Sequence, residues 1–482
     1  MTLAVVSFST IQSGENLMRE ESPSATVPAR LDRLAWRPIH TGITLALGVG
    51  WLLDAFEVNV VANVLGVLRA LWHLSSVEAS AIVTVWLVGL MFGALFFGYL
   101  ADRFGRRRLF LVTLLLYSTA TVISALSPGY AFFLVFRFLT AIGVGAEYSA
   151  INAAIGELIP ARYRGRAAAT VMNFWPLGTI LAAGVTLYFI NLFPASIGWR
   201  FAFALGAIIA LFTLWVRRVL PESPRWLMGK GHVKQARDIL DRLEGGASRF
   251  PVSAAEVADL PEASAAAPGF WQQLRRLIAD HPGRLALGCA LDFTEAAGYY
   301  GIFAFLPLVV LPAVGIGQRR VPEFFLVGNI GAVVGGIFAA TFLDKAGRKP
   351  TVTAFYLLAA ISLLVMGAAT REGSARGVLL CFVFVNFAAT GSWISAYPTF
   401  SEIFPTSLRS TGIGASVAFG RVGAALAPPV LVLLSRGASP SAAFALLASC
   451  YALGAAAMIP WWIWGPEGRG RPLEILAGEK NG

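Results

Sequence analysis

Charged residues are scarce in this chain: only 13% of its 482 residues are Asp, Glu, Lys or Arg, whereas 57% are hydrophobic. A soluble domain carries roughly 25% charged residues, so this composition excludes an ordinary soluble protein. Histidine and cysteine are also rare, and neither shows metal-ligand or disulfide spacing. Cys289, Cys381 and Cys450 fall in apolar segments, where we expect small packing residues. We predict no cofactor, no metal and no catalytic residue.

Long apolar runs, by contrast, extend along the whole chain. Each run of about 18–25 residues can cross a hydrocarbon core roughly 30 Å thick, whereas a transmembrane barrel would show short alternating segments. We therefore predict an all-α polytopic membrane protein with twelve transmembrane helices in the lipid bilayer. The expected spans are 42–65, 79–100, 107–127, 130–152, 168–190, 198–219, 284–310, 323–343, 350–369, 377–398, 411–435 and 441–465.

The basic residues account for the formal net charge of +11 without a nucleic-acid partner. They gather in the loops after spans two, four and eight, while the loops after spans three, five and eleven hold at most one. Loops rich in Lys and Arg stay in the cytoplasm. This asymmetry predicts a multi-pass protein of the cell inner (plasma) membrane with both termini in the cytoplasm, and no binding to nucleic acid.

The chain contains an internal repeat. GYLADRFGRRR at 98–108 matches ATFLDKAGRKP at 340–350, and GELIPARYRGR at 156–166 matches SEIFPTSLRST at 401–411. Four acids keep their order and a nearly constant separation in the two halves. These pairs are Asp54 with Asp292, Asp102 with Asp344, Glu157 with Glu402 and Glu222 with Glu467. The spans therefore form two pseudo-symmetric six-helix bundles.

The repeat divides the chain into five parts. We expect a cytosolic N-terminal tail at 1–41, a first bundle at 42–219, a cytoplasmic linker at 220–282, a second bundle at 283–465 and a cytosolic tail at 466–482. Within the linker, HVKQARDILDRLEGG and GFWQQLRRLIAD have apolar residues at helical spacing. We predict two amphipathic helices there, the second lying along the inner membrane surface.

Several motifs resemble those of the major facilitator superfamily. GYLADRFGRRR and its weaker copy resemble the superfamily's loop motif, and PESPRW with PEGRGRPLE resembles the ends of the two halves in sugar porters. NFWPLG at 173–178, TEAAGYYGIFAFLP at 294–307 and YPTFSEIFPTSLRSTGIG at 397–414 are more similar to one branch, which contains the nicotinate and aromatic-acid:proton symporters, organic-ion transporters and synaptic vesicle glycoproteins. The resemblance covers about 40–469 and implies a secondary transporter that works by alternating access.

Two apolar segments carry paired acids, LDAFE at 53–57 and LDFTE at 291–295. A charge in hydrocarbon costs at least a few kcal/mol, so such residues should face a cavity or a partner. The i, i+3 spacing places both acids of each pair on one side of their helix. The superfamily fold implies that spans one and seven face each other across the central cavity, so all four acids could approach the transport pathway.

Arg137 is the expected partner of the first pair. It lies about 10 Å deep in span four at 1.5 Å per residue, a depth compatible with Glu57. In sugar porters and similar symporters an acid at the Glu57 position pairs with this arginine and carries the coupling proton, so the resemblance implies that role here. A static salt bridge is the alternative. Asp54 and Glu147 are further candidates for proton coupling, or members of a packing network.

Arg421 is the residue that points to an anionic substrate. It lies about 15 Å into span eleven, near the bilayer midplane, and a guanidinium can hold a carboxylate through two hydrogen bonds. A bridge to Asp292 or Glu295 is the alternative. Rings and amides suit a planar ligand, although they also pack membrane helices. The candidate substrate-binding residues are Arg421, Asn173, Trp175, Asp292, Glu295, Tyr299, Tyr300, Asn386 and Trp393.

Charged residues at cytoplasmic helix ends form a third group. In the superfamily such residues make a network that holds the inner gate shut and is lost when the halves rock. Independent solvated pairs, the alternative, would contribute little. The resemblance implies a gate role for Asp102, Arg106, Glu157, Arg164, Arg166, Glu222, Arg225, Asp344, Arg348, Glu402, Arg409 and Glu467.

We therefore predict a proton-coupled symporter that imports a small planar organic anion, with nicotinate (niacin) or a similar aromatic carboxylate first. Its partners are this anion, protons and the lipid bilayer, and we expect a monomer. A sugar porter is disfavoured because LDFTEAAGYYG replaces the usual glutamine-rich signature. An organic-cation transporter is another alternative, and a non-transporting membrane receptor belongs to a different class. No nucleophile–base arrangement supports an enzyme.

Overall fold

The computed structural model describes residues 31, 34–104, 106–160, 163–216, 220–229, 231–244, 270–405, 408–437 and 439–465. This part of the chain is helical and contains no β-strand. The helices of the first half are α3 (Pro38–Leu71), α4 (Ser76–Phe104), α5 (Arg106–Ala125), α6 (Tyr130–Leu158), α7 (Arg164–Met172), α8 (Phe174–Leu192) and α9 (Ala195–Val216).

The second half repeats this series. Its helices are α14 (Pro282–Phe305), a π-turn η3 (Leu306–Val310), α15 (Leu311–Ala313), a 3-10 turn η4 (Gln318–Arg320), α16 (Val321–Lys345), α17 (Arg348–Arg371), α18 (Ala375–Ile403), α19 (Arg409–Gly437) and α20 (Pro440–Trp464). Between the halves lie α10 (Pro224–Gly229), α11 (Val233–Glu244) and α13 (Phe270–Asp280). Helices α11 and α13 coincide with the two amphipathic segments predicted in the linker.

Ten helical segments of the described chain are long and apolar enough to cross a membrane. Two shorter apolar helices, Leu111–Ala125 and Ala195–Ile208, complete the predicted twelve. Large apolar side chains face outward along these helices: Ile361, Leu364 and Leu453 are each more than half exposed. Lipid tails can cover such a surface, so the all-α polytopic fold class is confirmed.

Two spans are less regular than the sequence pattern indicates. The fifth divides at Asn173 into α7 and α8, and Pro176 in the first turn of α8 cannot donate the backbone hydrogen bond that a continuous helix requires. The seventh passes from α14 into the π-turn at Leu306, next to Pro307. Proline placement therefore changes the backbone at two points where the hydropathy is uniform.

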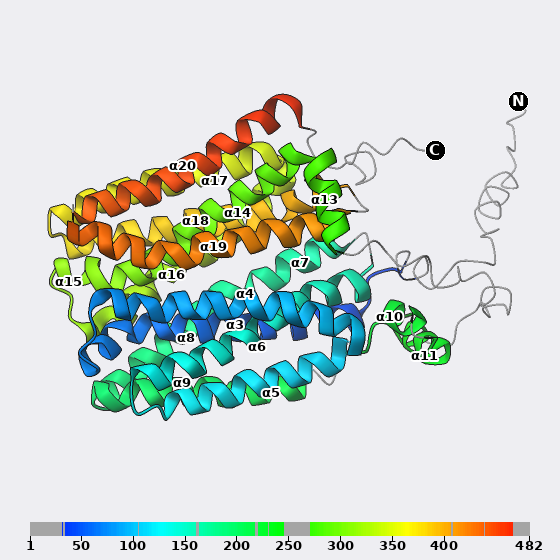
Figure 1. Ribbon diagram of the computed structural model, residues 1–482, viewed down its shortest axis with the longest axis horizontal. Helices are drawn as coiled ribbons and strands as arrows, with labels where there is room; N and C mark the ends of the chain where they lie inside the picture. The colour runs from blue at the N-terminus through cyan, green and yellow to red at the C-terminus, as the bar shows by residue number, and fades with distance from the viewer. Residues whose placement is uncertain are drawn as a thin grey trace, which may run out of the picture.

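Helix packing follows the sequence repeat. In the first half α3 packs on α8, α4 on α6, α5 on α6 and α9, and α3 on α9. In the second half the corresponding contacts join α14 to α19, α16 to α18, α17 to α18 and α20, and α14 to α20. Figure 1 shows the two resulting bundles, with blue and cyan helices in one and yellow to red helices in the other. Equivalent helices therefore make equivalent contacts, as two-fold pseudo-symmetry requires.

The halves meet along two symmetry-related helix pairs, α4 with α19 and α8 with α16. Thr84 on α4 donates a hydrogen bond to the carbonyl oxygen of Ala425 on α19 at 2.9 Å. Within the first half, Gly93 and Gly145 let α4 and α6 approach so closely that a Cβ at either position would overlap the facing backbone. Small residues thus permit close helix crossings inside a bundle.

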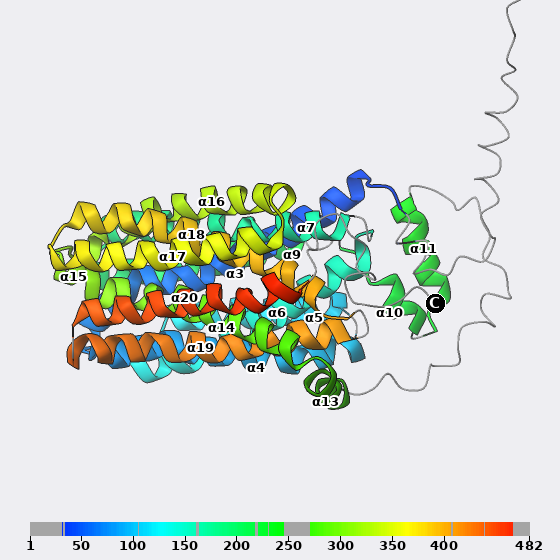
Figure 2. The same cartoon turned by 90° about the horizontal axis from the view of Figure 1, so that it is seen from above.

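One end of the molecule carries α10, α11 and α13, and the opposite end carries α15 (Figure 2). At the α15 end, α3 of the first half contacts η3 and η4 of the second. The Arg69 guanidinium donates to the carbonyl oxygen of Leu308 at 3.4 Å, and the Gln318 side chain packs on Gly66. The two halves are therefore in contact at this end of the central cavity.

Candidate functional site

A buried ion pair joins α3 to α6 within the first bundle. The Arg137 guanidinium lies 3.2 Å from the Glu57 carboxylate and donates a second hydrogen bond, 3.1 Å long, to the Glu57 carbonyl oxygen. Arg137 is fully buried and Glu57 is 2% exposed. Trp86 of α4 lies beneath the guanidinium, with 4.0 Å between Cζ and the ring centroid. The guanidinium is therefore held by a carboxylate, a carbonyl oxygen and an aromatic face at once.

The other acids proposed for proton coupling lie in the same bundle. Asp54 on α3 and Glu147 on α6 are both fully buried. Asp54 is one helical turn from Glu57 toward the N-terminus of α3, and α3 and α6 are packed together. The first bundle therefore encloses three buried carboxyl groups, of which Glu57 is the one in direct contact with Arg137.

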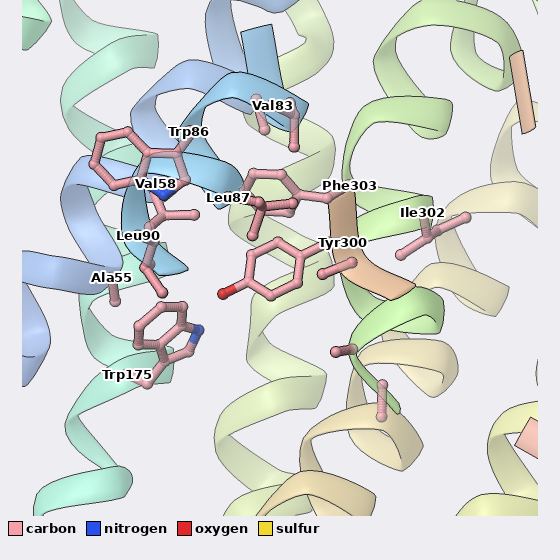
Figure 3. Close-up of a cluster of buried hydrophobic side chains, with 14 of the residues drawn as sticks. Ala55, Val58, Val83, Trp86, Leu87, Leu90, Trp175, Tyr300, Ile302 and Phe303 are labelled. Atoms are coloured by element: carbon pink, nitrogen blue, oxygen red, sulfur yellow. The ribbon is translucent and has the colours of Figure 1, made fainter. Parts of the chain in front are cut away.

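A central cavity lies between the bundles. Figure 3 shows Trp175 and Tyr300 projecting from α8 and α14, one from each half, with Leu87 and Leu90 of α4 nearby. Six of the residues predicted to bind substrate line this cavity, together with Thr390 of α18. The lining consists of Trp175, Glu295, Tyr299, Tyr300, Thr390, Trp393 and Arg421.

Arg421 brings a positive charge to a wall in which four of the seven lining residues are aromatic. Its Cζ lies 5.8 Å from the centroid of the Tyr300 ring, and its side chain is 7% exposed. Across the cavity, the Trp175 indole donates a 3.0 Å hydrogen bond to the Tyr299 hydroxyl. A planar ligand here would meet ring faces and a guanidinium that can bind a carboxylate.

The structure adds a tryptophan that the sequence pattern did not reveal. Trp51 of α3 stacks parallel to Trp393, with centroids 6.2 Å apart and an interplanar angle of 2°. Trp175 is tilted by 57° toward both, at 5.9 Å from Trp51 and 5.8 Å from Trp393. Three indoles from both halves therefore form one cluster beside the cavity. In the sequence Trp51 lies three residues before Asp54, so a helix places both residues on the same side. This spacing is the sequence signal that could have identified Trp51.

Asp292 and the two asparagines do not line the cavity. Asp292 is 2% exposed and packs against Gly420, immediately before Arg421 on α19. The Asn173 amide donates to the carbonyl oxygen of Ala169, and its oxygen faces Gly336 of the other half. Asn386 is buried in α18. Asn173 therefore lies at the α8–α16 contact and not in the cavity lining.

The proposed gate residues are described only in part. Arg164 donates to the carbonyl oxygen of Ile159 at 3.0 Å, and Arg348 donates to that of Leu343 at 3.1 Å. In each case the arginine caps the end of the preceding helix. Glu222 accepts a bond from the Ser223 amide, Glu157 is partly buried, and Arg166 is exposed. Glu467 and the side chains of Asp102, Arg106, Arg225, Asp344, Glu402 and Arg409 lie outside the described residues.

The fold and the charged cavity agree with the comparisons with known proteins. Residues 15–476 match the family described as sugar (and other) transporter. The chain belongs to this family. It adopts the fold of the Escherichia coli proton:xylose symporter of the major facilitator superfamily bound to 6-bromo-6-deoxy-D-glucose, with a TM-score of 0.73 at 24% identity, over 91% of this chain and 98% of that one.

Two curated relatives extend over nearly the same length. A niacin transporter of Acinetobacter baylyi is 30% identical over 449 residues, which cover 93% of this chain and 99% of the relative. A putative niacin/nicotinamide transporter of Bacillus subtilis is 29% identical over 429 residues, covering 89% and 96%. The protein is therefore a multi-pass membrane transporter of the major facilitator superfamily, and not an enzyme.

Proposed function

We propose that this transporter is a proton-coupled symporter that imports nicotinate or a similar aromatic carboxylate. The observation that carries the proposal is the cavity between the halves, where Arg421 lies among Trp175, Trp393, Tyr299 and Tyr300. The guanidinium matches a carboxylate, and the rings match a flat heterocycle. The niacin transporter of Acinetobacter baylyi supports the same substrate class, since it aligns along nearly its whole length.

Proton coupling is assigned to Glu57 with Arg137. An arginine partner favours the ionised form of a carboxyl group, while removal from water favours the protonated form. A change in the contact between α3 and α6 therefore changes proton binding at Glu57, and α3 also provides Trp51 beside the cavity. Rocking of the halves can in this way link proton binding to substrate binding. Asp54 and Glu147 serve as relay residues in the same bundle.

The rest of the cycle follows from the two-bundle architecture. The halves, 42–219 and 283–465, rock about the α4–α19 and α8–α16 contacts, and the linker at 220–282 lies on the cytoplasmic side with both termini. The gate charges near Arg164 and Arg348 close that side when the α15 end opens. We place the protein in the cell inner membrane as a monomer, because a single chain supplies the residues from both halves that line the cavity.

The decisive experiment is uptake of labelled nicotinate into proteoliposomes with an inward proton gradient. We expect accumulation above the external concentration that collapses when a protonophore is added. Uptake that ignores the gradient would remove the symport assignment, and absence of nicotinate uptake under every gradient would remove the substrate assignment. Glu323→Gln is a matched control, because this carboxylate is exposed and pairs with Arg320 at 3.1 Å outside the cavity.

A second candidate substrate class is a neutral or cationic pyridine. Glu295 also lines the cavity, and a carboxylate there favours a ligand without negative charge. The Bacillus subtilis relative is named for both niacin and nicotinamide. Competition between labelled nicotinate and unlabelled nicotinamide separates the two classes: if nicotinamide competes better than nicotinate, Glu295 rather than Arg421 selects the ligand.

A further inference from the structure

Among its described residues, the second bundle contains two buried carboxyl groups and one buried arginine. Asp292 and Glu295 lie three residues apart on α14, are 2% and 7% exposed, and therefore lie on the same side of the helix. Arg421 of α19, the one buried cation among the described residues of this half, follows Gly420, which packs against Asp292, and it lines the cavity together with Glu295. If both carboxyl groups were ionised, the cluster would hold a net charge of −1 inside the membrane.

The other neighbours of the pair do not supply a compensating charge. They are uncharged tyrosine and cysteine side chains of α14 and of the helices α17, α18 and α20. In the described part of the chain these groups are Tyr397 on α18, Tyr356 on α17, Tyr451 on α20, and Tyr299 and Cys289 on α14 itself. The Tyr356 hydroxyl donates to the carbonyl oxygen of Leu291 at 2.8 Å, and Asp292 Oδ2 has no hydrogen-bond partner in the described chain.

The first bundle also places a buried carboxyl group beside an arginine, but in a different arrangement. There Glu57 and Arg137 form a one-to-one pair with a direct contact of 3.2 Å. In the second bundle two carboxyl groups face one guanidinium, and like charges in a water-poor site disfavour ionisation of both. Such a pair titrates as a unit, so a proton belongs to the pair and not to one residue.

We propose that Asp292 and Glu295 form a second proton-binding site, which holds one shared proton when the cavity is empty and takes up another when an anion binds Arg421. With one proton, the two carboxyl groups and Arg421 are neutral together. An anionic substrate adds one negative charge, and a second proton restores neutrality. The anion step rests on the proposed function, whereas the shared proton does not.

The shared proton is tested in the ligand-free protein by infrared spectroscopy at neutral pH, through the C=O stretch of protonated carboxyl groups. Asp292→Asn and Glu295→Gln should each lose one protonated carboxyl, because the remaining carboxylate is then balanced by Arg421. Glu323→Gln, at an exposed position 42% accessible, should leave the band unchanged. Retention of the full band in both Asp292→Asn and Glu295→Gln would overturn the shared proton.

The anion step is tested by nicotinate affinity as a function of pH in a Glu57→Gln background, which removes the carboxyl group assigned to proton coupling in the first bundle. Uptake of one proton predicts an affinity that rises about tenfold for each unit by which the pH falls. Either single substitution in the pair should keep this slope, because one carboxyl group remains to take the proton. Glu57→Gln/Asp292→Asn/Glu295→Gln should bind nicotinate independently of pH.

Two results would contradict this step. An unchanged slope in the triple variant would place the linked proton elsewhere and overturn the role of the pair in anion binding. No nicotinate binding by any variant at any pH would reject the anion step together with the proposed substrate, and the infrared result would then decide the shared proton by itself.

Discussion

Helices α3 and α14 carry the same Asp-x-x-Glu pattern at equivalent positions, yet their surroundings differ. On α3, Glu57 is bound to Arg137 inside one bundle, and neither residue lines the central cavity. On α14, Glu295 lines the cavity beside Arg421, and Asp292 lies behind it against α19. A duplicated motif has therefore been placed once in a closed ion pair and once beside the ligand space. What separates the two copies is the position of the arginine.

Removal of Arg137 should have the largest effect, and this effect should be on stability. Arg137→Ala leaves a buried carboxylate without its partner, so we expect a loss of about 3–5 kcal/mol of stability. Thermal unfolding in detergent measures this loss. Glu57→Gln/Arg137→Met should recover most of it, because neither member of the pair is then charged. Arg320→Ala, which breaks an exposed pair, should cost less than about 1 kcal/mol. Equal losses in Arg137→Ala and Arg320→Ala would mean that burial of the pair is unimportant.

Removal of Arg421 should affect the ligand more than the fold. Hydrogen bonds to a charged group contribute about 1.5–3 kcal/mol, so Arg421→Ala should weaken nicotinate binding roughly 10- to 150-fold. Isothermal titration at one fixed pH measures the dissociation constant, and Arg421→Lys tests whether the planar guanidinium is needed beyond its charge. Wild-type affinity in Arg421→Ala would exclude it as the carboxylate anchor.

The aromatic wall should give a smaller effect. Trp393→Ala removes a ring from the cavity and from its parallel stack with Trp51. Aromatic pairs contribute about 0.5–1.5 kcal/mol beyond area burial, so nicotinate affinity should fall up to about tenfold. Trp393→Phe should retain most of the affinity. Trp464→Ala, at a position 79% exposed, serves as a control, and an equal loss there would indicate a general effect of tryptophan removal.

Trp175→Phe should have the smallest effect, and it tests the contact between the halves. The substitution keeps a ring but removes the indole hydrogen bond to Tyr299 of the other half. Water in the cavity can replace this bond, so we expect its loss to cost about 0.5 kcal/mol, the low end of the range for one hydrogen bond. This corresponds to a two- to threefold change in the ratio of transporters open at the cytoplasmic side to those open at the α15 end. Spin-label distances between the bundles measure this ratio. No change would assign Trp175 to ligand contact alone.

Much of this architecture can be read from the sequence. Apolar runs fix which segments cross the membrane, because each run must satisfy its own backbone hydrogen bonds in lipid. The repeat around Asp54 and Asp292 revealed the two bundles. The resemblance to sugar porters, with compatible depths along the helices, paired Glu57 with Arg137. The break at Asn173 and the π-turn at Leu306 were not predicted, since hydropathy does not register the hydrogen bond that a proline removes.

The sequence by itself determined which charged residues are buried and how many helices cross the membrane. Both follow from the cost of polar groups in hydrocarbon. Only the tertiary structure decided which charges share a site. Spacing on one helix cannot show that Trp51 stacks on Trp393, or that two acids of α14 meet a single arginine of α19. Those contacts join residues more than a hundred positions apart, and they depend on how the helices cross and rotate against one another.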